Sequence, residues 1–129
     1  MRARYALWLA ALGFLVMPVA QATPSPIAQT EISYLLTQLA TSPCQFNRNG
    51  HWYEGRQAAA HLEEKYHSPF VWGHIGSAEE FIDKVATRSS ISGVEYAVRC
   101  GGAGTVSSAL WLRDQLGAFR RASEKPRSP

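Results

Sequence analysis

The two cysteines of the chain, Cys44 and Cys100, constrain its fold more than any other feature of the sequence. They are the only cysteines among 129 residues. An even count in a small exported chain favours a disulfide over two free thiols. Such a bridge would close a loop of about 57 residues and, on the chain-entropy model, stabilise the fold by about 4 kcal/mol. For a domain of this size, that is a large share of the free energy of unfolding.

The N-terminal residues predict that the chain is exported. Two arginines near the start precede an apolar run over residues 6–17, and residues 20–22 read Ala-Gln-Ala. This order is typical of a Sec signal peptide that is cleaved after Ala22. The run is shorter than the roughly 20 residues of a spanning helix, so no membrane span is expected after cleavage. We therefore predict a signal peptide over residues 1–22 and a periplasmic or secreted location.

The charge of the chain is concentrated near its ends. The whole sequence carries a formal charge of +3, whereas residues 23–119 hold seven basic and nine acidic side chains. A net charge of −2 disfavours a domain that binds nucleic acid through a basic face. We predict a short leader over residues 23–29, a single domain over 30–119 and a disordered basic tail over 120–129.

Hydrophobic periodicity predicts four helices, over residues 29–40, 55–67, 77–87 and 108–119. Ser77 precedes Glu80 by three residues, as in a capping box. The Asn-Gly pair at 49–50 is typical of a tight hairpin turn, and residues 94–100 alternate as a half-buried strand does. The sequence thus predicts an α+β domain in which about four helices pack on a small three-stranded antiparallel sheet, with one disulfide.

A bridge from Cys44 to Cys100 would also define the strand register. It would join the start of the first strand to the end of the third, so these strands must run antiparallel. If the cysteines face each other directly, Phe46 lies opposite Val98, and the spatial order of the strands is second, first, third. A diagonal bridge would move this register by two residues.

The same register gathers polar residues at one end of the sheet. It pairs Arg48 with Tyr96 and brings the hairpin turn beside the hydroxyl-rich segment 88–93. The candidate binding residues at this end are Arg48, Asn49, Ser89, Ser90 and Ser92. An arginine with amides and hydroxyls suits an anion or a carboxylate. We favour an internal alternative, in which Arg48 bonds the carbonyls that end the third helix and the hydroxyls cap the connector, because a small fold must first satisfy its own groups.

The remaining motifs predict no catalytic residue, metal or cofactor. No serine lies in a GxSxG pattern, and segment 102–107, GAGTVS, departs from the dinucleotide-binding pattern at its third glycine. The four histidines are His51, His61, His67 and His74. None of them has the i, i+4 spacing that places two imidazoles on one helical face. An aromatic groove for a glycan or peptide stays possible, built from Trp52, Trp72 or Trp111.

Four ordered segments carry a resemblance to a known family. They are FNRNGHWYEG, AAAHLEEKY, SAEEFIDKVATRSSISG and VEYAVRC. Together they resemble the bacterial domain-of-unknown-function family 5329, whose members are small exported proteins. The resemblance covers residues 30–118 and implies a periplasmic or secreted domain without an established activity. It assigns no catalytic residue.

Three functional hypotheses follow. The first, which we favour because no catalytic motif occurs, is a non-catalytic binding or interaction module of the cell envelope, with an unknown envelope protein, peptide or glycan as partner. The second is a small hydrolase or transferase that acts on envelope polymers with a Ser/His pair. A serine oxygen within about 3 Å of a histidine nitrogen in an open cleft would favour it. In the third, the basic tail docks on anionic lipid or polysaccharide.

Overall fold

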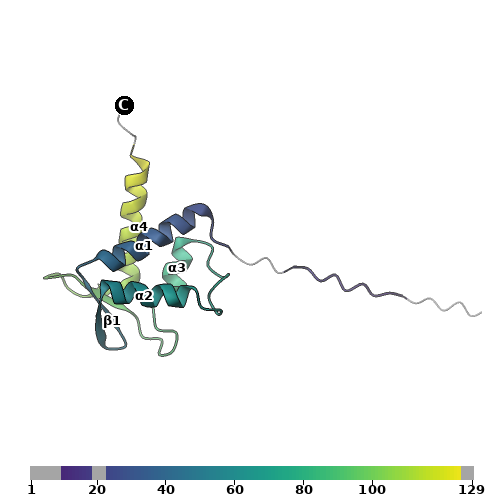
Figure 1. Ribbon diagram of the computed structural model, residues 1–129, viewed down its shortest axis with the longest axis horizontal. Helices are drawn as coiled ribbons and strands as arrows, with labels where there is room; N and C mark the ends of the chain where they lie inside the picture. Colours follow the sequence, from purple (N-terminus) through teal and green to yellow (C-terminus); the bar gives the residue numbers. More distant parts are fainter. Residues whose placement is uncertain (1–9, 19–22, 126–129) are drawn as a thin grey trace, which may run out of the picture.

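Four helices and four short strands make up the described part of the chain, residues 10–18 and 23–125 of the computed structural model (Figure 1). The helices are α1 (Pro26–Thr41), α2 (Gly55–Tyr66), α3 (Ala78–Val85) and α4 (Ser108–Glu124). The strands are β1 (Gln45–Arg48), β2 (His51–Glu54), β3 (Ala97–Arg99) and β4 (Val106–Ser107). Residues 10–18 form neither helix nor strand, and the predicted cleavage site at Ala22 lies outside the described residues. Within the described ranges, no helix is both long and apolar enough to cross a membrane.

The strands form one antiparallel sheet in the order β2-β1-β3-β4. The predicted α+β class and the order of the first three strands are confirmed, but the predicted number of three strands is wrong. The fourth strand pairs Val106 with Val98 and Ser107 with Ala97. Two residues are too few to produce a period-two pattern, so β4 has no signal in the sequence.

The predicted disulfide joins Cys44 to Cys100, with their Cα atoms 4.3 Å apart. This separation suits directly opposed residues of a non-hydrogen-bonded antiparallel pair. The predicted pairing of Phe46 with Val98 is confirmed. The ladder ends one position before the predicted pair of Arg48 with Tyr96, and the Tyr96 N–H donates to the Thr87 carbonyl at 2.9 Å.

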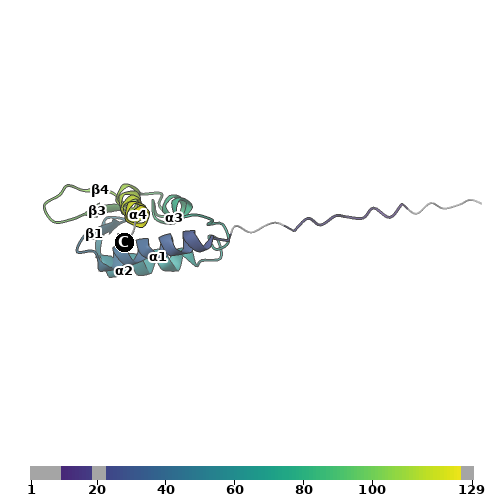
Figure 2. The ribbon, with the colours of Figure 1, turned by 90° about the horizontal axis from the view of Figure 1, so that it is seen from above.

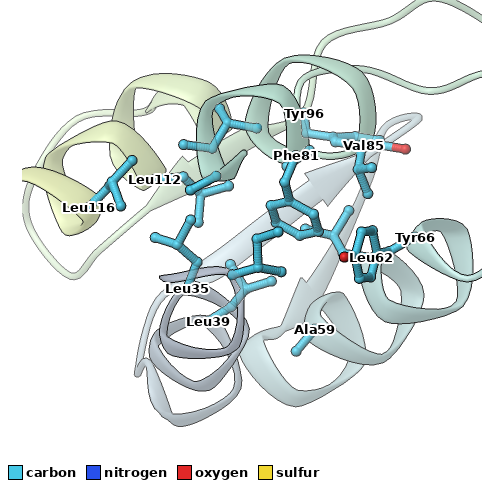
Figure 3. Close-up of a cluster of buried hydrophobic side chains, with 14 of the residues drawn as sticks. Leu35, Leu39, Ala59, Leu62, Tyr66, Phe81, Val85, Tyr96, Leu112 and Leu116 are labelled. Atoms are coloured by element: carbon cyan, nitrogen blue, oxygen red, sulfur yellow. The ribbon is translucent and has the colours of Figure 1, made fainter. Parts of the chain in front are cut away.

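The core combines side chains from all four helices with side chains from the sheet. Figure 2 shows α1 and α2 side by side, with α3 and α4 on the other side of the space between the layers. Large side chains from each helix fill this space in Figure 3, and they include Leu35, Leu62, Phe81 and Leu112. Phe81 is fully buried and sits at the centre of the cluster, with Tyr66 packed edge-on against it at 5.4 Å. The sheet contributes Phe46 and Val98 to the same core.

Serine caps begin three of the helices. Ser77 accepts a hydrogen bond from the Glu80 N–H at 3.1 Å, which confirms the predicted start of α3. Ser25 caps α1 in the same way, and Pro26 occupies the first helical turn, so α1 begins within the predicted leader. Ser107 caps α4.

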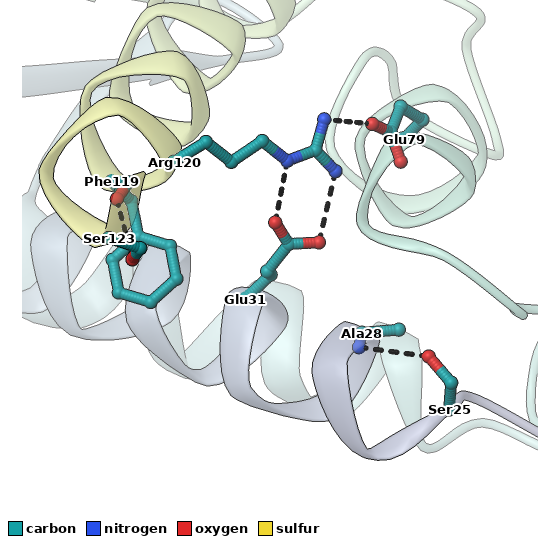
Figure 4. A network of polar contacts seen from close by, with 7 residues as sticks. All are labelled: Ser25, Ala28, Glu31, Glu79, Phe119, Arg120 and Ser123. Carbon is teal, nitrogen blue, oxygen red and sulfur yellow. Dashed lines mark hydrogen bonds and ion pairs between the residues drawn. The ribbon is translucent and has the colours of Figure 1, made fainter. Parts of the chain in front are cut away.

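The last helix corrects the predicted boundary of the disordered tail. Helix α4 continues to Glu124, so residues 120–124 are helical, and residues 126–129 lie outside the described part. Arg120 donates two hydrogen bonds to the buried Glu31 carboxylate of α1, at 2.6 and 3.0 Å, and forms an ion pair with Glu79 of α3 (Figure 4). One arginine thus joins α1, α3 and α4.

Candidate functional site

The hairpin turn and the serine-rich loop meet through Asn49. Its Nδ2 donates to Ser89 Oγ at 3.5 Å, and its Oδ1 accepts from Ser92 Oγ at 2.6 Å. Three of the five predicted binding residues therefore lie together, as the strand register requires. Asn49 has a φ of 52°, a left-handed conformation that asparagine tolerates in a tight turn.

The hydroxyls of this loop are used by the loop itself. Ser89 is only 6% exposed, and its Oγ accepts from the N–H groups of Ile91 and Ser92 at 3.3 Å each. The Ser92 Oγ in turn accepts from the Val94 N–H at 3.3 Å. Ser90 is exposed on the loop surface. The loop is thus built as a hydrogen-bonded connector between α3 and β3.

Arg48 points away from the serines. Its Nη1 lies 2.7 Å from Nδ1 and 3.2 Å from Nε2 of His61, and its Nη2 lies 3.5 Å from the Tyr53 hydroxyl. The reason is strand alternation: Arg48 shares a face of β1 with the buried Phe46, and α2 covers that face. The structure therefore separates Arg48 from the other four predicted residues.

The predicted internal role of Arg48, hydrogen bonds to the carbonyls that end the third helix, is wrong. Other side chains donate to a carbonyl in the last turn of α3 and to one in the connector that follows it. Lys65 Nζ donates to the Arg88 carbonyl at 2.7 Å, and Thr87 Oγ1 donates to the Ile82 carbonyl at 2.7 Å. The contacts of Arg48 are instead with the side chains of His61 and Tyr53.

A cavity of about 400 Å³ lies beside this arginine, between α2 and the hairpin. Its apolar wall includes Leu39, Phe46, Ala58 and Leu62. Its polar wall includes Arg48, Tyr53, His61 and Tyr96. Both the size of the cavity and the mixture of a mostly apolar wall with a few convergent polar groups are typical of small-molecule sites.

The polar wall holds its histidine in the neutral form. Burial, followed by the charges of Arg48 and Lys65, lowers the pKa of His61 below its ordinary value of 6.5. Since a guanidinium only donates, the ring nitrogen that faces Arg48 must accept. His61 Nε2 also lies 3.3 Å from the Tyr96 hydroxyl, and burial raises the pKa of Tyr96. The polar wall therefore combines one permanent cation, Arg48, with a neutral imidazole and two phenols, and Glu64 also lines the cavity.

The cation of this wall has no carboxylate partner. None of the ion pairs formed within residues 10–18 and 23–125 includes Arg48. Its interactions are with a neutral imidazole and a phenol, and its guanidinium carbon lies 5.0 Å above the Tyr53 ring. A positive charge in the wall of this cavity can thus receive an anion.

The other sequence hypotheses have different outcomes. Among the described residues, no hydrogen bond joins a serine to a histidine, and no group of three or more His, Cys, Asp or Glu side chains is placed to hold a metal ion. The three tryptophans named for the aromatic groove each have a different neighbour. Trp52 lies under the Arg99 guanidinium at 3.9 Å, Trp111 packs on Phe46, and Trp72 stacks on His67.

Sequence reasoning missed His61, Tyr53 and Tyr96 as members of one site. The only signal in the sequence was the alternation of faces along the two strands of the hairpin. Tyr53 faces Phe46 across the hairpin, so Tyr53 and Arg48 share the covered face of β1 and β2. His61 precedes the buried Leu62 on α2, but only the packing of α2 onto the hairpin determines which strand residue it meets.

Fold and site together define a small disulfide-bonded α+β domain whose cavity combines apolar walls with an arginine that forms no ion pair with any carboxylate of the described residues. The model of a family of unknown function, DUF5329, matches residues 26–120, from the first turn of α1 to the arginine that joins three helices. The chain belongs to this family. No curated protein and no solved structure matches it.

Proposed function

We propose that this protein is an exported, non-catalytic binding module of the cell envelope and that its ligand occupies the cavity beside Arg48. The observation that carries the proposal is an arginine, at the wall of a cavity of about 400 Å³, that has no carboxylate partner in the part of the chain that the structure describes. A buried or half-buried cation is costly unless something compensates it, so a ligand anion is the natural partner.

Binding is favoured over catalysis because the polar groups of the cavity are engaged with one another. The neutral His61 accepts from Arg48, and both of its ring nitrogens lie near other protein groups. A hydrolase would need a nucleophile within reach of such a base. Both cysteines are oxidised, and the described serines form no hydrogen bond with a histidine.

Of the predicted binding residues, we assign Arg48 to the ligand. Asn49, Ser89 and Ser92 hold the hairpin turn against the connector, and Ser90 serves neither role. The natural ligand is a small molecule, or a group carried by an envelope protein, peptide or glycan. Crosslinking with mass spectrometry on intact cells would name a macromolecular partner. Crosslinks only to cytoplasmic proteins would contradict the envelope role.

A fragment screen tests whether the cavity binds at all. A library of charged and neutral compounds, followed by NMR, should contain hits that shift the amide signals of Gln57 and Ala60 on the cavity wall. Ala58→Leu narrows the cavity with a helix-compatible side chain and should abolish these shifts. Ala122→Leu makes the same substitution on the exposed surface of α4 and should leave them intact. Failure of every fragment, or unchanged binding in Ala58→Leu, would contradict the proposal.

Export has its own test. The signal-like N-terminus and the Cys44–Cys100 disulfide support it. Cell fractionation followed by intact mass measurement should find an envelope or secreted form that begins at Thr23, with thiols that resist alkylation until a reductant is added. A cytoplasmic protein that keeps its N-terminal segment and two alkylatable thiols would contradict export.

A further inference from the structure

The charges around the cavity specify the kind of ligand more narrowly. The groups that face His61 are Arg48 from β1, Tyr53 from β2, Glu64 and Lys65 from α2, and Tyr96 from the segment before β3. Burial raises the pKa of Tyr96, so its phenol is neutral at physiological pH. Arg48 and Lys65 carry two positive charges and Glu64 one negative charge, so the neighbourhood has a net charge of +1.

Only one of the two cations is available to a ligand. Lys65 Nζ donates to the Arg88 carbonyl at 2.7 Å and lies 3.4 Å from the Tyr96 hydroxyl, so it is used within the fold. Arg48 has five N–H donors, and its partners in the fold are the two neutral side chains His61 and Tyr53. A carboxylate can accept two parallel hydrogen bonds from one guanidinium.

The apolar wall of the cavity favours a ligand that carries an apolar group. Leu39, Phe46 and Leu62 line it, and each of them also belongs to the buried core. A volume of about 400 Å³ equals that of about a dozen water molecules in the liquid. A ligand body of about ten carbon atoms would therefore fit against these side chains.

We propose that the cavity binds a monocarboxylate with a short apolar body, with the carboxylate on Arg48 and the body against Phe46 and Leu62. This inference rests on the proposed function and names its ligand class. A single negative charge balances the local excess of +1. A phosphate ester, which carries close to two negative charges, would leave an uncompensated charge beside Glu64.

Binding of such a ligand changes the titration of His61. The positive charge of Arg48 is one of the causes that lower the pKa of His61, and burial is the largest. A carboxylate on Arg48 offsets this repulsion, so the pKa of His61 rises in the complex. A neutral ligand in the same cavity does not raise the pKa of His61, because it adds burial without charge.

Three probes with one chain length test the ligand class: octanoate, 1-octanol and octyl phosphate. In calorimetric and NMR titrations, octanoate should bind at least about 10-fold more tightly than the other two, as expected for charge-assisted hydrogen bonds. Arg48→Gln should lose about 10-fold in octanoate affinity and keep its affinity for 1-octanol. Arg56→Gln removes an exposed arginine of α2 that does not line the cavity, and it should bind octanoate as the unmodified protein does.

The outcomes separate this inference from the proposed function. If 1-octanol binds as tightly as octanoate, or octyl phosphate binds more tightly, the carboxylate class is overturned while the cavity remains a binding site. If the fragment screen finds ligands but octanoate does not bind, the inference fails alone. If no compound binds, both fail. Should Arg48→Gln not fold, the probe comparison and the pKa of His61 in the unmodified protein still decide, and an unchanged pKa with octanoate overturns the inference.

Discussion

The contact between the end of α1 and the start of α2 depends on the absence of a side chain at Gly55. Gly55 is the buried first residue of α2. A Cβ atom at this position would lie 2.1 Å from the Leu39 carbonyl oxygen and 3.1 Å from that of Ser42. In protein structures, a Cβ atom essentially never lies within 3.0 Å of a non-bonded heavy atom. The obstacle in Gly55→Ala is backbone, which cannot rotate aside as a side chain can.

The cost of Gly55→Ala follows from this geometry. Relief of the overlap requires α1 and α2 to separate by about 1 Å, and overpacking of this kind costs about 3 kcal/mol at the upper end of its usual range. The better helix propensity of alanine returns at most about 1 kcal/mol. A net loss of about 2 kcal/mol should lower the melting temperature of a domain of this size by about 8–16 °C.

Thermal unfolding followed by far-UV circular dichroism measures this loss. Gly104→Ala is the matched control, because the added Cβ would have no heavy atom within 4 Å and its backbone is not in the left-handed region. The control should change the free energy of unfolding by less than about 0.5 kcal/mol. If Gly55→Ala melts within about 2 °C of Gly104→Ala, the two helices do not pack as closely as described.

Three further predictions concern the disulfide and two titrating groups. Joint replacement of Cys44 and Cys100 by serine should lower the free energy of unfolding by about 4 kcal/mol. An unchanged midpoint of urea denaturation would contradict a stabilising role of the disulfide. The hydrogen bond from Arg120 lowers the pKa of Glu79 below its ordinary value of 4.5. The stability that this ion pair adds to the folded state is therefore complete above pH 4.5 and is lost as pH falls through the lower pKa of the folded state. In denaturation curves measured at several pH values, the free energy of unfolding of Arg120→Ala should therefore decrease less steeply as pH falls. Identical pH profiles of the variant and the unmodified protein would contradict the ion pair. The lowered pKa of His61 means that the unfolded chain binds the proton more readily, so stability should decline as pH falls below 6.5; an NMR titration midpoint at or above 6.5 would contradict the neutral imidazole.

The disulfide could be predicted from the even count of cysteines, and the strand register from local patterns combined with that bridge. Alternation along residues 94–100 and the hairpin turn orient the strands, and the bridge then leaves few registers open. Phe46 meets Tyr53 on one side and Val98 on the other as this logic requires. The two-residue β4 was missed because it exists only through pairing with β3.

The candidate site was only partly predictable. The position of Arg48 on the covered face of β1 follows from strand alternation, but its neighbour His61 belongs to α2, and no local pattern relates these two residues. Likewise, composition alone favoured a solvated tail from residue 120. The partners of Arg120, Glu31 and Glu79, are distant in sequence, and three helices must pack before they meet.

By itself, the sequence determined the helices, the hairpin, the sulfur bridge and the order of the first three strands, because each depends on the chemistry of neighbouring residues or on a covalent link. The tertiary structure alone decided where the polar side chains point. Hydrogen bonds and ion pairs act over a few ångströms, so the environment of Arg48, and with it the cavity, exists only after α2 has packed on the hairpin.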